Sequence, residues 1–379
     1  MTNPMREQVF SLPELLRGQY KDLEPKVRKL FSTPELFSFR RIILSGCGDS
    51  RAASMAVLRS FERLTHLPVE VVSTIDLARF YDERHFGSAP HNPLVIMVSN
   101  SGNVARVAEA ARRALDRGAF VLGITGNPDS PLGLNATRIL PLAIPPFRSA
   151  PGTRSYIVSI LALLLIAVRI GEVRGCYTMD TAMAIRGDIG VQAEALERML
   201  PGMDRQMLAL ARAWQSLEAW DFVGAGPDYA TAWYGHAKVF EATGQYAMHI
   251  NSEEWMHLNF FARRTRAIAT VVAASSNNEG LSRTKEVIAY MRSLGRPLLI
   301  ISDQPWHDFD TGGLEFVITP ASAFADSFPV FQCTPINLLA GFVMTLLGET
   351  PGRGCAGPWA FAKDGAGVRE SKIVLQGGA

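Results

Sequence analysis

The sequence predicts an α/β protein with two tandem, doubly wound parallel sheets, and three observations lead to this prediction. The chain has 379 residues, which suits two domains of about 150–200 residues each better than one. Short runs rich in Val, Ile and Leu alternate with amphipathic stretches of helical period. The same succession of runs occurs twice along the chain. Because the apolar runs are continuous, we expect strands buried on both faces, as in parallel sheets covered by helices.

The first half begins with a helical lead-in and continues with strands that end in polar turns. Residues before 39 have the pattern of helices, and the predicted strands span 41–44, 94–98 and 120–125. The run 155–170 is the most apolar segment of the chain. It is shorter than the roughly 20 residues that a membrane span needs, so we predict a buried core helix there.

The second half repeats this order after a helical connection over 185–219, with strands predicted over 220–223, 268–274 and 297–302. Three pairs of landmarks lie 178, 176 and 177 residues apart: Gly46 and Gly224, Ser99 and Ser275, and Gly118 and Gly295. This near-constant separation indicates a tandem duplication. We therefore predict a lead-in over 1–39, domains over 40–200 and 201–350, and a tail over 351–379 with a short strand at 372–375.

Composition and charge exclude several classes of protein. Hydrophobic residues make up 47% of the chain, which is ample for a packed interior and argues against disorder. The net charge of +2 leaves no basic excess for nucleic-acid binding. The cysteines Cys47, Cys176, Cys333 and Cys355 are scattered and show no metal-ligand spacing. We therefore expect no metal and no nucleic-acid partner. Because no apolar signal segment follows Met1, we also expect a cytoplasmic protein without membrane association.

The turn Ser99-Asn100-Ser101-Gly102 is the most distinctive motif of the first half. It follows a predicted strand and precedes a helix that we expect to start near Asn103. Ligands bind at the carboxyl ends of the strands in open parallel sheets. Backbone N–H groups and a helix amino terminus favour an anion there, and a phosphate monoester is the usual one. The alternative is that these polar side chains only cap the helix.

The turn Gly46-Cys47-Gly48-Asp49-Ser50 should lie at the same edge of the sheet. It differs from a dinucleotide-binding motif because Arg51 stands where that motif has its third glycine. We therefore expect no nicotinamide cofactor. The working alternative is a tight turn that lets Ser50 face the same pocket as the Ser99 turn.

The second half carries ionisable residues in place of the serine-rich turn. Lys238 and Glu241 are three residues apart and would share one face of a helix. An ordinary surface ion pair is the simplest interpretation of that spacing taken alone.

Glu254 and His257 have the same spacing, beside Trp255 and two phenylalanines. Aromatic neighbours would exclude water from a carboxylate or imidazole and move its pKa toward neutrality, which suits proton transfer. The other histidines show no comparable pattern and are interpreted as incidental: His66, His85, His91, His236, His249 and His307.

At these residues the sequence resembles the tandem SIS (sugar isomerase) domain family, over about residues 40–375. The family includes the isomerase half of glucosamine-6-phosphate synthase, SIS-type glucosamine-6-phosphate deaminases and Amadori-phosphate deglycases. The resemblance implies two flavodoxin-like SIS domains and a small phosphosugar substrate. The chain is too short for a complete amidotransferase, so we expect no glutamine-hydrolysing domain.

Two sets of residues match the family's phosphate-binding turns. Ser99-Asn100-Ser101, followed by Gly102, matches its phosphate-binding Ser-Gln-Ser, with Asn in place of Gln. Ser50 matches the serine of its Cys-Gly-Thr-Ser loop, and Thr153 falls on the Ala-Ser-Thr-Lys turn that closes the pocket. The resemblance implies that these residues bind the phosphorylated substrate.

Two further motifs match the family's catalytic residues. Ala237-Lys238-Val239-Phe240-Glu241 matches Leu-Lys-Leu-Lys-Glu, which implies that Glu241 is the general base and Lys238 its neighbouring lysine. Glu254-Trp255-Met256-His257 matches Glu-Leu-Lys-His, whose histidine opens the sugar ring. Lys372 corresponds to the lysine that reaches the open-chain substrate from the C-terminal tail, so the tail is expected to complete the active site.

The sequence also departs from the family pattern. Asn103 and Val104 replace the glutamate and threonine that follow Ser-x-Ser-Gly, which removes one hydroxyl from the phosphate turn. The residues after His257 are Leu258-Asn259 and not Gly-Pro. These changes bear on the choice of substrate more than on the chemistry.

The residues and the resemblance together predict a phosphosugar aldose–ketose isomerase or aminosugar-phosphate deaminase that needs no metal or organic cofactor. His257 would open the ring, and Glu241 would move a proton between C1 and C2 of the open-chain 6-phosphate. Lys238 or Lys372 would stabilise the developing oxyanion.

Two alternatives remain at this point. One is an Amadori (fructosamine or opine) 6-phosphate deglycase, and the other is a non-catalytic sugar-phosphate sensor. The resemblance also implies a homodimer with shared active sites, in which His257 acts in its own or in the partner subunit's pocket.

Overall fold

The computed structural model describes residues 1–86, 92–309, 315–324, 331–350 and 366–374. These residues group into two units, each built around one sheet. The first unit holds 16–146, 155–187 and 366–374, and the second holds 1–15, 147–154 and 188–350. Cys355 and most of the predicted tail lie outside the described residues. The domain boundaries predicted from the sequence stay predictions.

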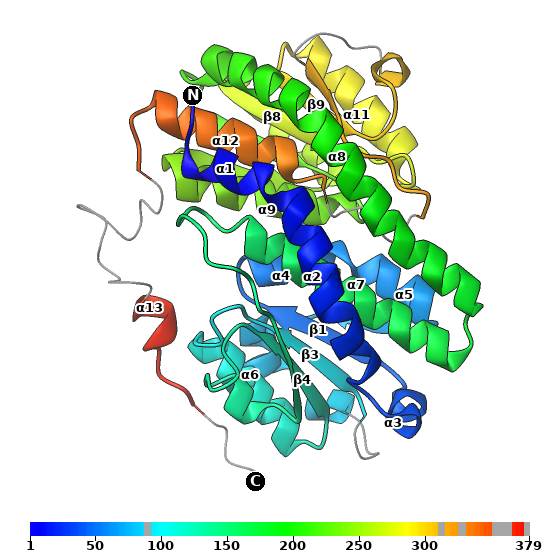
Figure 1. Ribbon diagram of the computed structural model, residues 1–379. Coiled ribbons are helices and arrows are strands. Elements are labelled where there is room, and N and C mark those ends of the chain that lie inside the picture. The colour runs from blue at the N-terminus through cyan, green and yellow to red at the C-terminus, as the bar shows by residue number, and fades with distance from the viewer. Residues whose placement is uncertain (87–91, 310–314, 325–330, 351–365, 375–379) are drawn as a thin grey trace. The chain divides into compact units, whose positions relative to one another are not determined.

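The first sheet has five parallel strands in the order β2-β1-β3-β4-β5. Figure 1 labels its neighbouring strands β1, β3 and β4. The strands are β1 Ile42–Gly46, β2 Val69–Val71, β3 Leu94–Val98, β4 Phe120–Thr125 and β5 Arg138–Pro141. Every residue of β1, β3 and β4 is buried. This burial is what continuous runs of Ile, Leu and Val produce when helices cover both faces of a sheet.

The helices of the first unit alternate with these strands. They are α2 Leu12–Arg28, α3 Thr33–Ser38, α4 Asp49–Ala56, α5 Leu58–Thr65, α6 Ala105–Asp116, α7 Arg154–Arg174, α8 Met179–Trp214 and α13 Ala366–Arg369, with short turns η1 Asp76–Phe80, η2 Glu83–Phe86 and η3 Gly133–Asn135. The first few residues of α2, the first residue of α7 and most of α8 belong to the second unit. The strand predicted over 372–375 is wrong for 372–374, which follow α13 without pairing in a sheet.

The second sheet also has five parallel strands, in the order β10-β9-β8-β6-β7. The strands are β6 Ala219–Val223, β7 Tyr246–Ile250, β8 Ile268–Ala273, β9 Leu298–Ser302 and β10 Phe316–Ile318. Read from β7 to β10, the order is that of the first sheet, with β6 in the place of β1 and β8 in the place of β3. The predicted pair of doubly wound parallel sheets is confirmed.

The helices of the second unit follow the same alternation. They are α1 Pro4–Phe10, α9 Asp228–Thr243, α10 Ser252–His257, α11 Leu281–Ser293 and α12 Thr334–Leu346, with short turns η4 Asn259–Phe261, η5 Thr265–Ala267 and η6 Trp306–Phe309. The α12 helix is buried along most of its length. It packs against α1 and α9.

The predicted core helix over 155–170 is present as α7. This helix is long and apolar enough to cross a membrane by length and composition, but 83% of its most apolar window is buried inside the protein. Burial of this kind is expected of a core helix in a doubly wound fold. It is the single helix of that character among the described residues.

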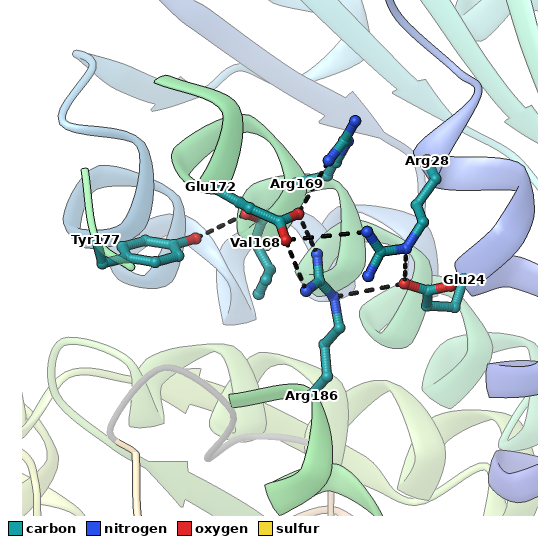
Figure 2. A network of polar contacts seen from close by, with 7 residues as sticks. All are labelled: Glu24, Arg28, Val168, Arg169, Glu172, Tyr177 and Arg186. Carbon is teal, nitrogen blue, oxygen red and sulfur yellow. Dashed lines mark hydrogen bonds and ion pairs between the residues drawn. The ribbon is translucent and has the colours of Figure 1, made fainter. Parts of the chain in front are cut away.

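A buried ionic network joins three helices of the first unit (Figure 2). Glu172 of α7 accepts hydrogen bonds from Arg186 of α8 at 2.7 Å and from Arg169 at 3.1 Å. Arg28 and Glu24 of α2 extend the network. Burial alone would raise the pKa of Glu172, but the two arginines outweigh it and hold the pKa below its ordinary value. The network thus ties the lead-in helix α2 to the core helix α7.

Candidate active site

The two polar turns of the first unit lie at one edge of the first sheet. The strands β1 and β3 are neighbours, and their last residues, Gly46 and Val98, are paired. Both strands run in the same direction, so the turn that ends at Ser50 and the Ser99 turn leave the sheet side by side. This edge leads into α4 and α6, as Figure 1 shows.

The Ser99 turn has a fixed backbone. Gly102 has a φ of +67°, and a Cβ there would lie 1.9 Å from the Ser130 hydroxyl, so only glycine fits. The Gly102 N–H donates to the Ser99 carbonyl at 3.0 Å, and the Gly126 N–H donates to the Asn100 carbonyl at 2.9 Å. These bonds connect the turn to the end of β4 and hold its shape without a ligand.

The turn presents donors that the chain does not use. Within the described residues, the backbone N–H groups of Asn100 and Ser101 donate to no acceptor. The Ser101 hydroxyl is half-buried and accepts a hydrogen bond from the Asn103 N–H at 3.3 Å. The helix α6 starts at Ala105, with Val104 as its N-cap and no side-chain cap. The interpretation that the polar side chains of this turn only cap the helix is therefore wrong.

The Gly46 turn is equally tight. A Cβ at Gly46 would lie 2.8 Å from the Cβ of Ser50, and Gly48 has a φ of +55°. The Ser50 N–H donates to the Cys47 carbonyl at 3.1 Å, which leaves the half-buried Ser50 side chain at the start of α4. This is the tight turn that the sequence predicts.

Two arginines at this edge were not predicted as site residues. Arg51 and Arg106 lie in the first turns of α4 and α6. Burial raises the pKa of the Cys47 thiol, and the Thr74 hydrogen bond and the charges of both arginines act against that rise. Their position directly after the two polar turns is the signal that could have identified them.

The C-terminal tail reaches the same unit. Arg106 donates hydrogen bonds to the Lys372 carbonyl and, at 3.3 Å, to the Ser371 hydroxyl. The Lys372 side chain is exposed. Lys372 therefore lies beside α6, the helix that follows the Ser99 turn.

In the second unit, a series of contacts runs from Glu241 through Lys238 and Tyr234 to Gly152, the residue before Thr153. Lys238 is fully buried, and its Nζ lies 2.7 Å from Glu241 Oε2, whose side chain is 44% exposed. The same Nζ lies 4.9 Å from the centre of the Tyr234 ring. The Tyr234 hydroxyl donates to the carbonyl of Gly152, next to the buried Thr153, at 3.1 Å.

The ion pair on α9 therefore differs from the surface pair that the spacing alone suggests. A buried ammonium group must keep a partner, because an isolated charge inside a protein is very unfavourable. Lys238 consequently holds the Glu241 carboxylate in a fixed position while leaving it accessible.

The α10 helix carries Glu254 and His257 on its exposed side. The His257 side chain is 64% exposed and lies 3.4 Å from Glu253, and Glu254 is also exposed. Trp255 is buried. The expectation that aromatic neighbours exclude water from Glu254 and His257 is wrong for the single chain, because Trp255 points into the core. Within the described residues, His257 makes no hydrogen bond or ion pair with Glu241.

Two further histidines, His236 and His249, lie close together in the structure and were not predicted as a pair. The rings of His236 on α9 and His249 on β7 are 4.3 Å apart, and both contact Trp233. Burial lowers the pKa of His236. The helical spacing of Trp233, His236 and Phe240 is the signal that could have placed this ring on the face next to Glu241.

The comparisons with known proteins agree with this fold. Residues 35–169 match the SIS domain family. The chain is 24% identical over 293 residues to a glutamine–fructose-6-phosphate aminotransferase (isomerizing) of Gloeobacter violaceus, covering 76% of this chain and 47% of that protein. It is 25% identical over 360 residues to the protein of that name from Yersinia pseudotuberculosis, covering 92% and 56%. The chain thus spans about half the length of the curated relatives it matches.

Solved structures show the same fold. The C-terminal domain of glucosamine-fructose-6-phosphate aminotransferase from Francisella tularensis superposes with a TM-score of 0.76 at 17% identity, covering 93% of this chain and 98% of that one. Tagatose-6-phosphate ketose/aldose isomerase from Escherichia coli superposes with a TM-score of 0.73 at 18% identity, covering 94% and 96%.

The superpositions therefore show the fold of these solved structures over most of the chain, and the first half of the chain contains the match to the SIS domain family. The resemblance stated from the motifs is confirmed: residues 35–169 match the SIS domain family, and the chain is similar to isomerizing aminotransferases over most of its length.

Proposed function

We propose that this protein is an enzyme that transfers protons on the open-chain form of a sugar 6-phosphate or aminosugar 6-phosphate. The observation that carries the proposal is the Ser99 turn, where two backbone N–H groups lack an acceptor at the carboxyl edge of a parallel sheet. Two N–H groups together with serine hydroxyls suit a phosphoryl group, which offers several strong acceptor oxygens.

In this proposal the turns of the first unit bind the phosphoryl group. The N–H groups of Asn100 and Ser101 and the hydroxyls of Ser99, Ser101 and Ser50 would donate to its oxygens. Gly102 keeps the turn in the shape that aims these donors outward, and Thr153 is assigned to the turn that closes over the substrate. Hydroxyls supply donors without adding charge, so product release is not opposed by an ion pair.

Glu241 is proposed as the general base. It would take a proton from C1 or C2 of the open-chain substrate and return it to the neighbouring carbon, through an enediol or enolamine. Its accessible carboxylate and its 2.7 Å contact with the buried Lys238 support this role, because a base must be both reachable and fixed. Lys238 or Lys372 would stabilise the oxyanion that forms.

His257, with Glu254 beside it, is proposed to open the sugar ring by moving a proton between the anomeric hydroxyl and the ring oxygen. Its exposure in the single chain suits a residue that works in the pocket of a second subunit. We therefore also propose a homodimer in which the subunits share active sites.

The substrate decides the outcome of the same proton transfer. With an amine on C1 or C2, protonation of the enolamine gives an imine, and water hydrolyses its C=N bond to a carbonyl and a free amine, which is deamination or deglycation. Without an amine, the product is the isomeric sugar. The names of the relatives favour isomerisation or an aminosugar substrate. Release of ammonia would identify a deaminase, whereas release of a substituted amine would identify an Amadori-phosphate deglycase.

The test is a substrate screen with the purified full chain. We expect turnover of fructose 6-phosphate, glucosamine 6-phosphate or a fructosamine 6-phosphate, followed by separate detection of isomer, ammonia and free amine. Saturable binding of these compounds without turnover of any would identify a sugar-phosphate sensor and would contradict the enzyme proposal.

Glu241→Gln should lower kcat by about 10²–10⁴-fold with the substrate found, because it removes the general base. Phosphosugar affinity should change little. The matched control is Glu286→Gln, on the exposed face of α11, which should leave kcat unchanged. Full activity in Glu241→Gln would remove this residue from the mechanism.

A further inference from the structure

The second unit contains a counterpart of the phosphate-binding turns, and the chain's own side chains occupy it. The Asp228 N–H donates to the Ala225 carbonyl at 3.0 Å, as the Ser50 N–H donates to the Cys47 carbonyl at 3.1 Å. Gly224, like Gly46, has no room for a Cβ. Asp228 therefore occupies in the second unit the place that Ser50 occupies in the first.

A second acidic residue replaces a glycine. The Gln304 N–H donates to the Ser302 hydroxyl at 3.1 Å after β9, and the Asn127 N–H donates to the Thr125 hydroxyl at 3.2 Å after β4. This correspondence places Asp303 where the first unit has Gly126.

The hydrogen bonds between strands also show which backbone donors after β3 correspond to which donors after β8. Ser99 donates its N–H to the Ile124 carbonyl at 3.0 Å, and Ala274 donates to the Ile301 carbonyl at 2.9 Å. By this register Ser99 corresponds to Ala274 and not to Ser275. The pairing of Ser99 with Ser275 in the sequence comparison, 176 residues apart, is therefore shifted by one residue. The next two N–H groups belong to Asn100 and Ser101 in the first unit, and to Ser275 and Ser276 in the second.

In the second unit these two N–H groups are bound to carboxylates. Ser275 donates its N–H to Asp228 Oδ2 at 3.0 Å, and Ser276 donates its N–H to Asp303 Oδ1 at 2.7 Å. The hydroxyl of each serine donates to the same carboxylate. Each aspartate is therefore held by a backbone donor and a hydroxyl, which is how such a turn holds two oxygens of an anion.

Asp228 receives two more donors, Asn278 Nδ2 at 2.6 Å and Gln332 Nε2 at 2.8 Å, and is 1% exposed. Burial raises the pKa of Asp228, while the hydrogen bonds from Ser275, Gln332 and Asn278 oppose the rise and favour the carboxylate.

We propose that the second unit is an oxyanion site filled by the chain's own Asp228 and Asp303. It accepts inorganic phosphate or a phosphate monoester at the Ser276 N–H and hydroxyl once Asp303 is removed, and at the Ser275 donors as well once Asp228 is also removed. The chain consequently binds one phosphoryl group and not two. Asp228 is the first residue of α9, so its four donors anchor the helix that carries Lys238 and Glu241 without any ligand.

The test counts inorganic phosphate bound per chain by equilibrium dialysis. Asp303→Gly, and the double variant Asp228→Ser with Asp303→Gly, place the first unit's residues in the second. We expect each folded variant to bind one phosphate more than the unchanged protein. Circular dichroism and a thermal melt verify folding. If the double variant does not fold, phosphate binding by the single variant Asp303→Gly is the deciding measurement, because Asp303 is only half-buried.

The reciprocal change introduces the acid into the first unit. Gly126→Asp should weaken phosphate binding at the Ser99 turn at least tenfold relative to Gly126→Ala. The alanine control is needed because a Cβ there lies 3.1 Å from the Asn100 carbonyl oxygen.

The gain of a site in the Asp303 variants tests this inference, and the number of phosphates bound by the unchanged chain tests the proposed function. A folded Asp303→Gly that binds no additional phosphate would overturn the inference. An unchanged protein that already binds two would do the same.

Discussion

Single residues at the serine-rich edge decide what the first unit can bind. The side chain of Ser101 is half-buried, and its N–H has no acceptor in the part of the chain that is described. Both groups would contact a phosphoryl group far from the reacting carbons. Such a contact strengthens binding of the substrate and of the transition state alike.

Ser101→Ala should therefore raise KM for the phosphosugar by roughly 10–100-fold, the cost of a hydrogen bond to a charged group, with kcat nearly unchanged. Steady-state kinetics with the substrate found in the screen measures this. Ser293→Ala, at the end of α11, is the control. Equal losses in kcat and in kcat/KM would contradict the assignment to phosphate binding.

At the scale of elements, a buried ion pair holds α10 on the second sheet. Asp221 of β6 accepts hydrogen bonds from Trp255 at 3.2 Å and from Arg296 at 3.1 Å. Asn259 donates to the same carboxylate at 2.9 Å, and its carbonyl accepts from Arg296 at 2.7 Å. These contacts lie on both sides of His257 in the sequence, so they position the segment that carries it.

Asp221→Asn should lower the free energy of unfolding by about 3–5 kcal/mol, because it leaves the Arg296 guanidinium buried without its counter-charge. Urea unfolding of the full chain measures the change. The matched control is Glu218→Gln, which breaks the exposed pair with Arg264 and should cost less than about 0.5 kcal/mol. An equal effect of both substitutions would show that the buried pair adds no stability.

The short helix α3 is fastened to β5 by another pair. Arg138 donates to both carboxylate oxygens of Glu35, at 2.9 and 3.0 Å, and Glu35 completes a capping box with Ser32. The Arg138 hydrogen bond is the largest cause that lowers the pKa of Glu35, to about 2. Because the pKa of Glu35 is lower in the folded than in the unfolded protein, the pair contributes stability at a pH above the unfolded pKa. This stability is lost as the pH falls toward the folded pKa.

Glu35→Gln keeps the capping geometry and removes the charge. At pH 7 it should cost about 1 kcal/mol, as expected for a partly exposed pair. This difference from the unchanged protein should shrink as the pH falls from about 4.5 toward 2. Thermal melts across that range measure it, and a difference that does not depend on pH would contradict the ionic explanation.

At the scale of the whole molecule, the two units have the same strand order but different chemistry. The first unit has a turn with unused donors, and the second unit has filled its counterpart with Asp228 and Asp303 and carries Lys238, Glu241 and His257 instead. The proposed activity needs both sets of residues, and the exposure of His257 in the single chain is why we propose that subunits associate and share their active sites.

Mixing two inactive variants tests this proposal. Glu241→Gln and His257→Ala subunits, unfolded together and refolded, should recover about a quarter of the original activity if His257 acts in the partner's pocket, because half of the random dimers contain one intact site out of two. Each variant refolded alone is the control. No recovery in dimers that have mixed would mean that His257 acts in its own subunit.

The sequence by itself determined the duplication, six of the ten strands of the described residues and the position of the Ser99 turn after β3, but not the strands β2, β5, β7 and β10. These features depend on local patterns: continuous apolar runs such as 94–98, and a glycine such as Gly102 where the backbone needs a positive φ. The pattern of hydrophobic residues and turns depends on residues close together in the sequence, so it can be recognised without the tertiary structure.

Only the tertiary structure decided burial and the pairing of distant residues. The spacing of Lys238 and Glu241 suggested a surface pair, yet Lys238 is fully buried, and the aromatic residues expected to shield His257 leave it exposed. Asp303 reaches Ser276 and Asp228 reaches Ser275 because parallel strands bring their ends together at one edge. Which polar group faces which donor depends on packing between segments far apart in the chain, and local pattern carries no information about that.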